Sequence, residues 1–150
     1  MDQYALNIKT RAFIGGICAG LGLVHYDLQD KSIDREKFFV FCRRLKARMG
    51  ARPWVMYLDN LKVHTSIDSA TFLAEEGIEC IWAPLYSPDY NAIEFYFSQM
   101  KHWVKRARLN DMLERRKRTY DDYVAEAADK IDNEKVDGVI EHVLKLFKIK

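Results

Sequence analysis

The chain has 150 residues, of which 49% are hydrophobic and 31% charged, with a formal net charge of +2. This composition is typical of a globular protein with a buried core, and it excludes a disordered chain. No apolar run approaches the roughly 18 residues that a membrane-spanning helix needs, so we expect no membrane association. The N-terminus lacks the basic start and apolar stretch of a secretory signal, so we expect a nuclear location in a eukaryote and otherwise a cytoplasmic one.

The hydrophobic periodicity predicts alternating strands and helices. In chain order, these are two strands within residues 11–27, a helix over 32–49, a strand over 54–58, a helix over 66–76, a strand over 78–82, a helix over 91–106, and two helices over 119–131 and 136–147. Ser32 is the candidate N-cap of the first helix, and Gly50 ends it. The pattern predicts an α/β domain.

Two features of the predicted strands indicate special backbone positions. Gly15 and Gly16 interrupt the first strand, and a glycine pair within a strand predicts a bulge or a close backbone approach. Residues 54–58 form a short apolar run that stops abruptly at Asp59. This is typical of a buried parallel strand whose carboxyl end opens onto a site.

The cysteines do not form a recognisable framework. Cys18, Cys42 and Cys80 are widely spaced and have apolar neighbours. An odd number of cysteines without a CxxC pair argues against both a disulfide scaffold and a zinc site. We therefore predict buried, reduced thiols that pack as small hydrophobic side chains.

The charge of the chain is concentrated in one stretch, residues 101–118. Eight basic residues there are opposed only by Asp111 and Glu114, which leaves a local net charge of +6. The eight are Lys101, Lys105, Arg106, Arg108, Arg115, Arg116, Lys117 and Arg118. A concentrated basic segment next to acid-rich residues 119–142 indicates that one face meets a polyanion.

Two acidic residues stand where elements begin or end. Asp59 follows the predicted strand directly, and Glu94 lies in the first turns of the predicted helix, with 34 residues between them. Carboxylates at such positions can be brought together by an α/β fold. They are hard oxygen ligands, which suit Mg²⁺ or Mn²⁺ better than zinc.

The residues around these two acids form longer motifs. Residues 59–64 are a DNxxxH element, and residues 84–94 read PLYSPDYNAIE. Together they resemble the mariner-like transposases and their insertion-sequence relatives within the DDE superfamily endonucleases, whose signature is PxYSPDxNPIE. Ala92 stands where that family usually has Pro, which is a packing change. The 34-residue spacing is also that family's, and the resemblance covers roughly residues 5–106.

The resemblance implies a fold, a reaction and a site. The family has a ribonuclease H-like mixed sheet flanked by helices, and it cuts transposon ends and joins the freed 3′-hydroxyl to target DNA. A DDE or DDD triad holds Mg²⁺ (or Mn²⁺), with two ions when the triad is complete, and no small-molecule cofactor. Asp59 and Glu94 would be the second and third catalytic and metal-binding carboxylates.

The same resemblance implies supporting residues and a partner. Asn60 would orient Asp59 or contact a phosphate, although it could equally form the turn after the strand. His64 would contact a phosphate beside the metal site, with helix capping as its alternative role. The eight basic residues between 101 and 118 are then candidate contacts to the DNA backbone.

One part of the family's pattern is not found. Its first catalytic Asp ends a central strand well before the glycine-pair strand, yet only 14 residues precede Gly15. We therefore expect residues 1–106 to be a partial ribonuclease H-like catalytic domain without its first strand. Residues 107–150 would be a basic bend, at 107–118, and extra C-terminal helices packed on the same domain.

Three explanations for that gap stay open. In the first, the gene is split and a companion chain supplies the first strand and the first Asp; a homodimer is the other assembly that we expect. Alternatively, the chain is an inactive truncated relic. As a third possibility, it is a domesticated, non-catalytic DNA-binding or scaffold subunit that retains the fold.

Overall fold

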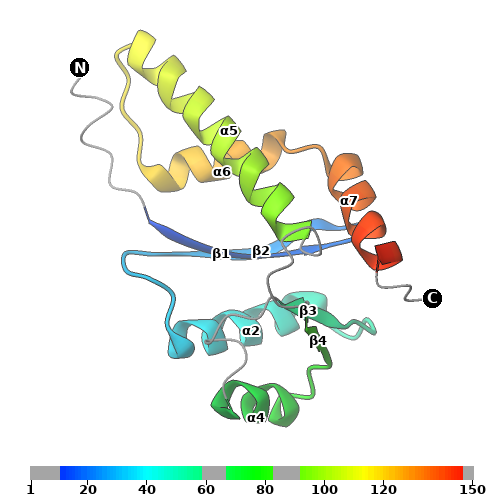
Figure 1. Ribbon diagram of the computed structural model, residues 1–150. Coiled ribbons are helices and arrows are strands. Elements are labelled where there is room, and N and C mark those ends of the chain that lie inside the picture. Colours follow the sequence, from blue (N-terminus) through cyan, green and yellow to red (C-terminus); the bar gives the residue numbers. More distant parts are fainter. Residues whose placement is uncertain (1–10, 59–66, 83–91, 147–150) are drawn as a thin grey trace.

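The computed structural model describes residues 11–58, 67–82 and 92–146, which hold four strands and five helices (Figure 1). In chain order these are β1 (Ala12–Cys18), β2 (Gly22–Gln29), α2 (Arg35–Met49), β3 (Met56–Leu58), α4 (Ile67–Glu75), β4 (Cys80–Trp82), α5 (Ala92–Leu113), α6 (Tyr120–Lys130) and α7 (Asn133–Leu146). The alternation predicted from the sequence is confirmed. No described helix is long and apolar enough to cross a membrane.

Strands β1 and β2 form an antiparallel hairpin whose glycine pair has the two effects expected of it. The register shifts between Gly16 and Ile17, which is the irregularity of a β-bulge. A Cβ atom built on Gly16 would lie 3.1 Å from Cδ1 of Leu45 and 3.5 Å from Cζ of Phe41. Gly16 therefore lets helix α2 pack closely on the hairpin.

Helix α2 begins three residues later than the sequence pattern predicted. Asp34, not Ser32, is the N-cap, because its side chain accepts a hydrogen bond of 2.9 Å from the backbone N–H of Lys37. At the other end Gly50 has a φ of 66°, and its N–H donates to the carbonyl of Lys46, so the predicted glycine stop is confirmed.

Helix α5 is longer than predicted. The sequence suggested an end at Arg106 and a charged bend over 107–118, but the helix continues to Leu113. The prediction failed because Ala107 and Asp111, which look unremarkable within a charged stretch, are both buried, at 4% and 0% exposure. The bend is thus confined to residues 114–119.

The hairpin separates two hydrophobic cores (Figure 1). On one side, Phe13, Tyr26 and other hairpin residues pack against α5, α6 and α7, with Tyr96 and Tyr123 at the centre. On the other side, Ile14 and Val24 pack against α2, α4, β3 and β4. The helices after residue 119 therefore share a core with α5 and the hairpin.

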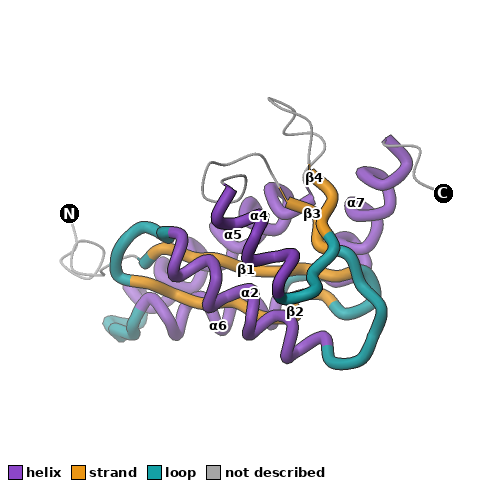
Figure 2. Tube along the Cα trace, turned by 90° about the horizontal axis from the view of Figure 1, so that it is seen from below, coloured by secondary structure: helices purple, strands orange, loops and turns teal. Residues whose placement is uncertain are grey.

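The described strands form two separate pairs. Strands β1 and β2 are antiparallel, β3 and β4 are parallel as predicted, and no ladder among the described residues joins one pair to the other (Figure 2). An edge of β1 and an edge of β3 are therefore left without a strand partner in the described part of the chain. Such edges are templates for pairing with a further strand.

The cysteines are free thiols, as predicted, but they are not equally buried. Cys42 is fully buried on α2, whereas Cys18 and Cys80 are half-buried. Burial raises the pKa of the Cys42 thiol to about 12, and it also raises the pKa of Cys80. Both are therefore protonated at neutral pH.

Candidate functional site

The described residues include only part of the predicted site. Strand β3 ends at Leu58, which directly precedes Asp59 in the sequence. Asp59, Asn60 and His64 lie outside the described residues, so their predicted roles stay predictions. Glu94, by contrast, lies in the first turn of α5 and can be described in detail.

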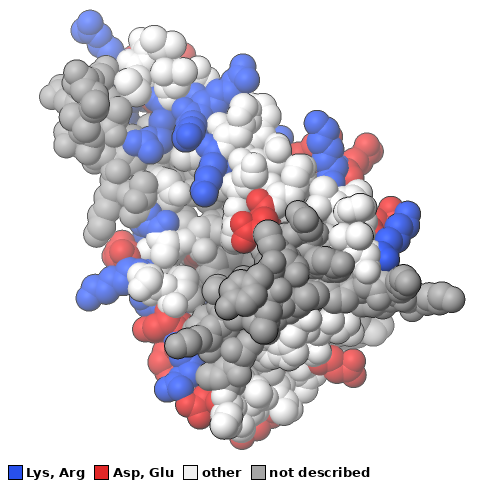
Figure 3. All heavy atoms as spheres, in the orientation of Figure 1, with Lys and Arg blue, Asp and Glu red and all other residues white. Residues whose placement is uncertain are grey.

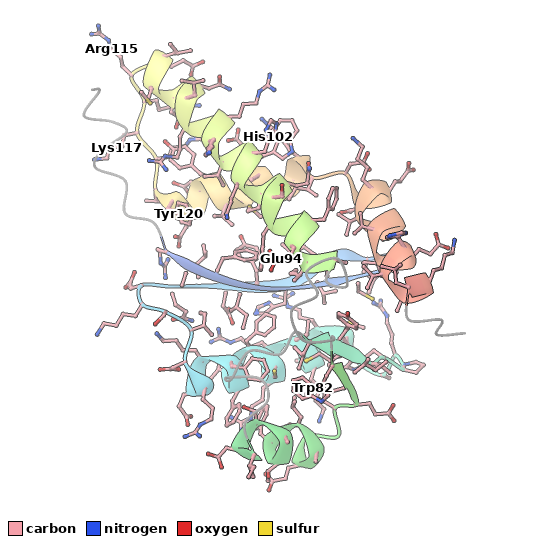
Figure 4. All side chains as sticks on the ribbon, in the orientation of Figure 1. Trp82, Glu94, His102, Arg115, Lys117 and Tyr120 are labelled. Atoms are coloured by element: carbon pink, nitrogen blue, oxygen red, sulfur yellow. The ribbon has the colours of Figure 1, made fainter. Side chains whose placement is uncertain are left out.

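Glu94 is an exposed carboxylate beside an open hollow. Among the described residues, none donates a hydrogen bond to it or forms an ion pair with it. The hollow has a volume of about 440 Å³ and follows one face of α5. It is lined by Glu94, Phe97, Ser98, Lys101, His102 and Lys105. In Figure 4 Glu94 lies at the start of α5, close to the hairpin, and His102 lies further along the same helix.

The lining residues share a face because of their spacing. Lys101 and Lys105 follow Glu94 by seven and eleven residues, which is two and three helical turns. Tyr96, Met100 and Val104 occupy the opposite face and are buried in the core. Burial of that face fixes the rotation of α5 about its axis, so the carboxylate and the two ammonium groups must point outwards.

The hollow combines two chemistries. The exposed carboxylate of Glu94, which no other described residue binds, is a ready ligand for a divalent cation. Two lysines one turn apart are suited to phosphate oxygens. In Figure 3, Lys and Arg side chains gather over the part of the molecule in which α5 runs. The face therefore carries one candidate cation ligand and a row of candidate anion contacts.

Trp103 contacts one more of the predicted basic residues, Arg106, and also a lysine of helix α6. The guanidinium of Arg106 lies 5.8 Å from the centre of the Trp103 ring, and the ammonium of Lys130, on α6, lies 5.5 Å from it. His102 packs edge-on against the same ring at 5.0 Å. Arg106 is thus exposed but held in place by an aromatic contact.

Asp111 organises the end of α5, and the sequence pattern did not reveal it. Its carboxylate is fully buried and accepts hydrogen bonds from Arg118 Nε at 2.8 Å, Arg116 Nη2 at 3.0 Å and the Tyr123 hydroxyl at 2.9 Å. Arg118 also reaches Glu126 at 3.1 Å. Hydrogen bonds from Arg118, Tyr123 and Arg116 lower the pKa of Asp111 to about 2.

This network divides the predicted basic cluster. Arg116 and Arg118 are bound to a buried carboxylate, which is a role in folding that the sequence analysis had not assigned to them. Arg108 is half-buried, while Arg115 and Lys117 are exposed. DNA contact by these residues stays a prediction. The only signal of this network in the sequence was that Asp111 is one of two acids within the basic stretch, and that pattern is equally consistent with a solvated surface.

The described residues do not by themselves form a metal centre. No group of three or more His, Cys, Asp or Glu side chains within residues 11–58, 67–82 and 92–146 is placed to hold a metal ion. Glu94 is available as one ligand, and any site built on it needs residues outside those ranges. Asp59 is the candidate named by the sequence.

The comparisons with known proteins give a family and a fold. A family model described as DDE superfamily endonuclease matches residues 7–115. The catalytic domain of the Mos1 mariner transposase matches with a TM-score of 0.65 at 17% identity, covering 85% of this chain and 66% of that one. Structures of the same domain with Raltegravir and Mn, or with Raltegravir and Mg, give the same score over 67% of their chain. No curated protein matches the chain.

These likenesses bear on the fold predicted from the sequence. At 17% identity, the match shows that the described elements have the arrangement of the Mos1 transposase catalytic domain, a ribonuclease H-like fold. The chain spans about two-thirds of the length of that domain. The family match covers both α5 up to its end and the segments that carry Asp59 and Glu94.

Proposed function

This chain belongs to the DDE superfamily endonucleases, and we propose that it is the catalytic segment of a transposase that cuts and joins DNA with Mg²⁺ or Mn²⁺. The observation that carries the proposal is the exposed carboxylate of Glu94, which has no partner among the described residues, at the start of a basic helix face. In an ordinary surface such a carboxylate is solvated and unimportant. Here it is also the final acid of the family's motif.

Glu94 and Asp59 are the proposed ligands of the metal. Both supply carboxylate oxygens, the donor type that Mg²⁺ and Mn²⁺ prefer. When bound, divalent ions activate a water or hydroxyl nucleophile and neutralise the charge that develops on the reacting phosphate.

The remaining residues of the hollow bind the substrate. Lys101 and Lys105 hold phosphates of the DNA strand that leads to Glu94, because they lie on its face of α5 within three turns. Such contacts place the backbone without reading the base sequence. Asn60 and His64, which adjoin Asp59 in the sequence, orient that carboxylate and contact the reacting phosphate.

A third carboxylate is supplied by a further polypeptide segment. We place it on a strand that pairs between the edges of β1 and β3. The separate strand pairs support this, because the backbone groups of half-buried β1 gain partners when such a strand is added. The segment is either further sequence of the same protein or part of a separate companion chain.

The test combines metal binding and DNA nicking. Mn²⁺ binding by the chain should be weakened by Glu94→Gln and by Asp59→Asn, and should be unchanged by Glu141→Gln, which alters an exposed acid on α7. Nicking of labelled transposon-end DNA by the chain with its completing segment should be abolished in the first two variants only, because the charge neutralisation by the metal is lost.

Two results would contradict parts of this proposal. Nicking that survives both substitutions would remove Asp59 and Glu94 from the site. Nicking by the chain alone, lost in both variants, would show that the third ligand lies within it. DNA binding without Mn²⁺ binding or nicking, even in the completed protein, would instead support a non-catalytic DNA-binding subunit.

A further inference from the structure

We infer that the turn at the end of α5 is a second contact to the DNA backbone, about one turn of duplex away from Glu94. This inference rests on the proposed function, and it describes where the DNA bound near Glu94 continues along α5. We call residues 114–118 the α5 tip. Two of its residues, Arg115 and Lys117, are the proposed phosphate contacts.

The tip has a defined backbone structure. The N–H of Arg116 donates to the carbonyl of Asp111 at 2.8 Å, and the N–H of Arg115 donates to the carbonyl of Met112 at 3.2 Å. This pair of hydrogen bonds is the Schellman motif that ends many helices. The tip is therefore a formed cap and not a frayed end.

Arg115 occupies the position of this motif at which glycine is preferred. Its φ is 55°, and it is the only non-glycine residue with a positive φ in the described part of the chain. For a residue with a Cβ atom, the left-handed conformation costs roughly 1 kcal/mol. An arginine at this position gives up stability that a glycine would provide. That cost is consistent with a function for the positive charge of Arg115 in binding.

The charges of the tip are of two kinds. Arg116 and Arg118 bind the buried carboxylate of Asp111 and so hold the turn in place. Arg115 and Lys117 are exposed, and neither forms an ion pair with a described residue. In Figure 4, Arg115 extends from the far end of α5, away from the strands, and Lys117 lies in the segment that follows. The network thus holds in place a turn that presents two exposed cations.

The distance between the tip and Glu94 matches a continuous duplex. The helix rises about 1.5 Å per residue, so the 19 steps from Glu94 to Leu113 span about 30 Å. At about 3.4 Å per base pair, this is about nine base pairs. Lys101 and Lys105 lie between the two ends. A duplex along α5 would therefore meet cations near Glu94 and again at the tip.

The test measures DNA binding and stability on the same variants. For a duplex of about 20 base pairs, Arg115→Gly should weaken binding roughly five- to tenfold at 0.1 M salt and reduce the salt slope by about one. Its melting temperature should stay the same or rise, because glycine suits a positive φ. A purely structural role for Arg115 would not produce lower affinity together with undiminished stability.

Matched variants and a shorter duplex complete the design. Lys117→Gln should reduce affinity in the same way, Arg115→Lys should retain it, and Arg48→Gln, at an exposed position on α2, should change nothing. On a duplex of about eight base pairs, which cannot reach both ends of α5, the tip variants should have much smaller effects.

Two results would overturn the inference. If the Arg115→Gly and Lys117→Gln variants bind the longer duplex as tightly as the wild type, the α5 tip does not contact DNA. If Lys101→Gln still weakens binding in that case, the proposed function stands and only the contact at the tip is refuted. Leu109 and Leu113 are also exposed near the tip, at 53% and 77%. If sedimentation shows that the wild type self-associates and Arg115→Gly does not, while the DNA affinity of the two is the same, the tip is a contact between copies of the chain.

Discussion

Replacing Asp111 with asparagine tests whether the network at the end of α5 holds the C-terminal helices in place. The substitution keeps the shape of the side chain but removes the charge to which Arg116 and Arg118 donate. Asparagine can still accept one hydrogen bond from Tyr123 or Arg118. The two guanidinium groups lose their counter-ion.

The expected loss of stability follows from the burial of the three groups. Removing one partner of a fully buried pair costs about 3–5 kcal/mol. Here the Asp111 side chain is 1% exposed, but those of Arg116 and Arg118 are 57% and 27% exposed, so both cations can turn towards water. We therefore expect a loss of about 2–3 kcal/mol in the free energy of unfolding.

The lowered pKa of Asp111 gives a second value for its contribution to the free energy of unfolding, and it predicts how that contribution depends on pH. A pKa lowered from 3.8 to about 2, chiefly by Arg118, corresponds to roughly 2 kcal/mol in favour of the folded, ionised form. A depressed folded pKa means that this contribution is complete above pH 3.8 and is lost as the pH falls towards 2. The difference between wild type and variant should therefore shrink below about pH 4.

Urea unfolding at several pH values measures both effects. At pH 7 the midpoint of Asp111→Asn should fall without a change in m-value, and its melting temperature should drop by about 5–10 °C. Asp129→Asn, at an exposed position on α6, should change stability by less than about 0.5 kcal/mol. A loss for Asp111→Asn below about 0.5 kcal/mol, or one that is the same at pH 3 as at pH 7, would refute this account of the network.

Three other predictions concern single groups. The Tyr96 hydroxyl is buried without a hydrogen-bond partner among the described residues, so Tyr96→Phe should raise the free energy of unfolding by up to about 1 kcal/mol; a loss would mean that the hydroxyl has a partner. Thr119 and Asp122 form a capping box at the start of α6, and Thr119→Ala should cost about 1 kcal/mol in urea unfolding. Cys42, whose pKa is raised to about 12 by burial, should resist thiol reagents at pH 8 in the folded protein and react once it is unfolded, as mass spectrometry can show.

The sequence by itself determined those features that depend on neighbouring residues. Hydrophobic periodicity and helix-ending residues predicted the helices and strands. Gly50 and Gly77, for example, end helices through their own positive φ, whatever packs against them. The motifs around Asp59 and Glu94 indicated the family, and the match of the family model to residues 7–115 confirms it. The metal-binding roles of those two residues stay predictions that rest on the motifs.

Only the tertiary structure decided which charges meet water and which meet each other. Asp111 could not be told from a surface acid by its neighbours in sequence, because Tyr123, whose hydroxyl donates a hydrogen bond to it, lies twelve residues away on α6. The same contact explains why α5 extends past the predicted bend. Likewise, the rotation of α5 that places Glu94, Lys101 and Lys105 on one outward face depends on the core packed behind it. Local patterns specify backbone geometry, whereas burial depends on residues distant in sequence.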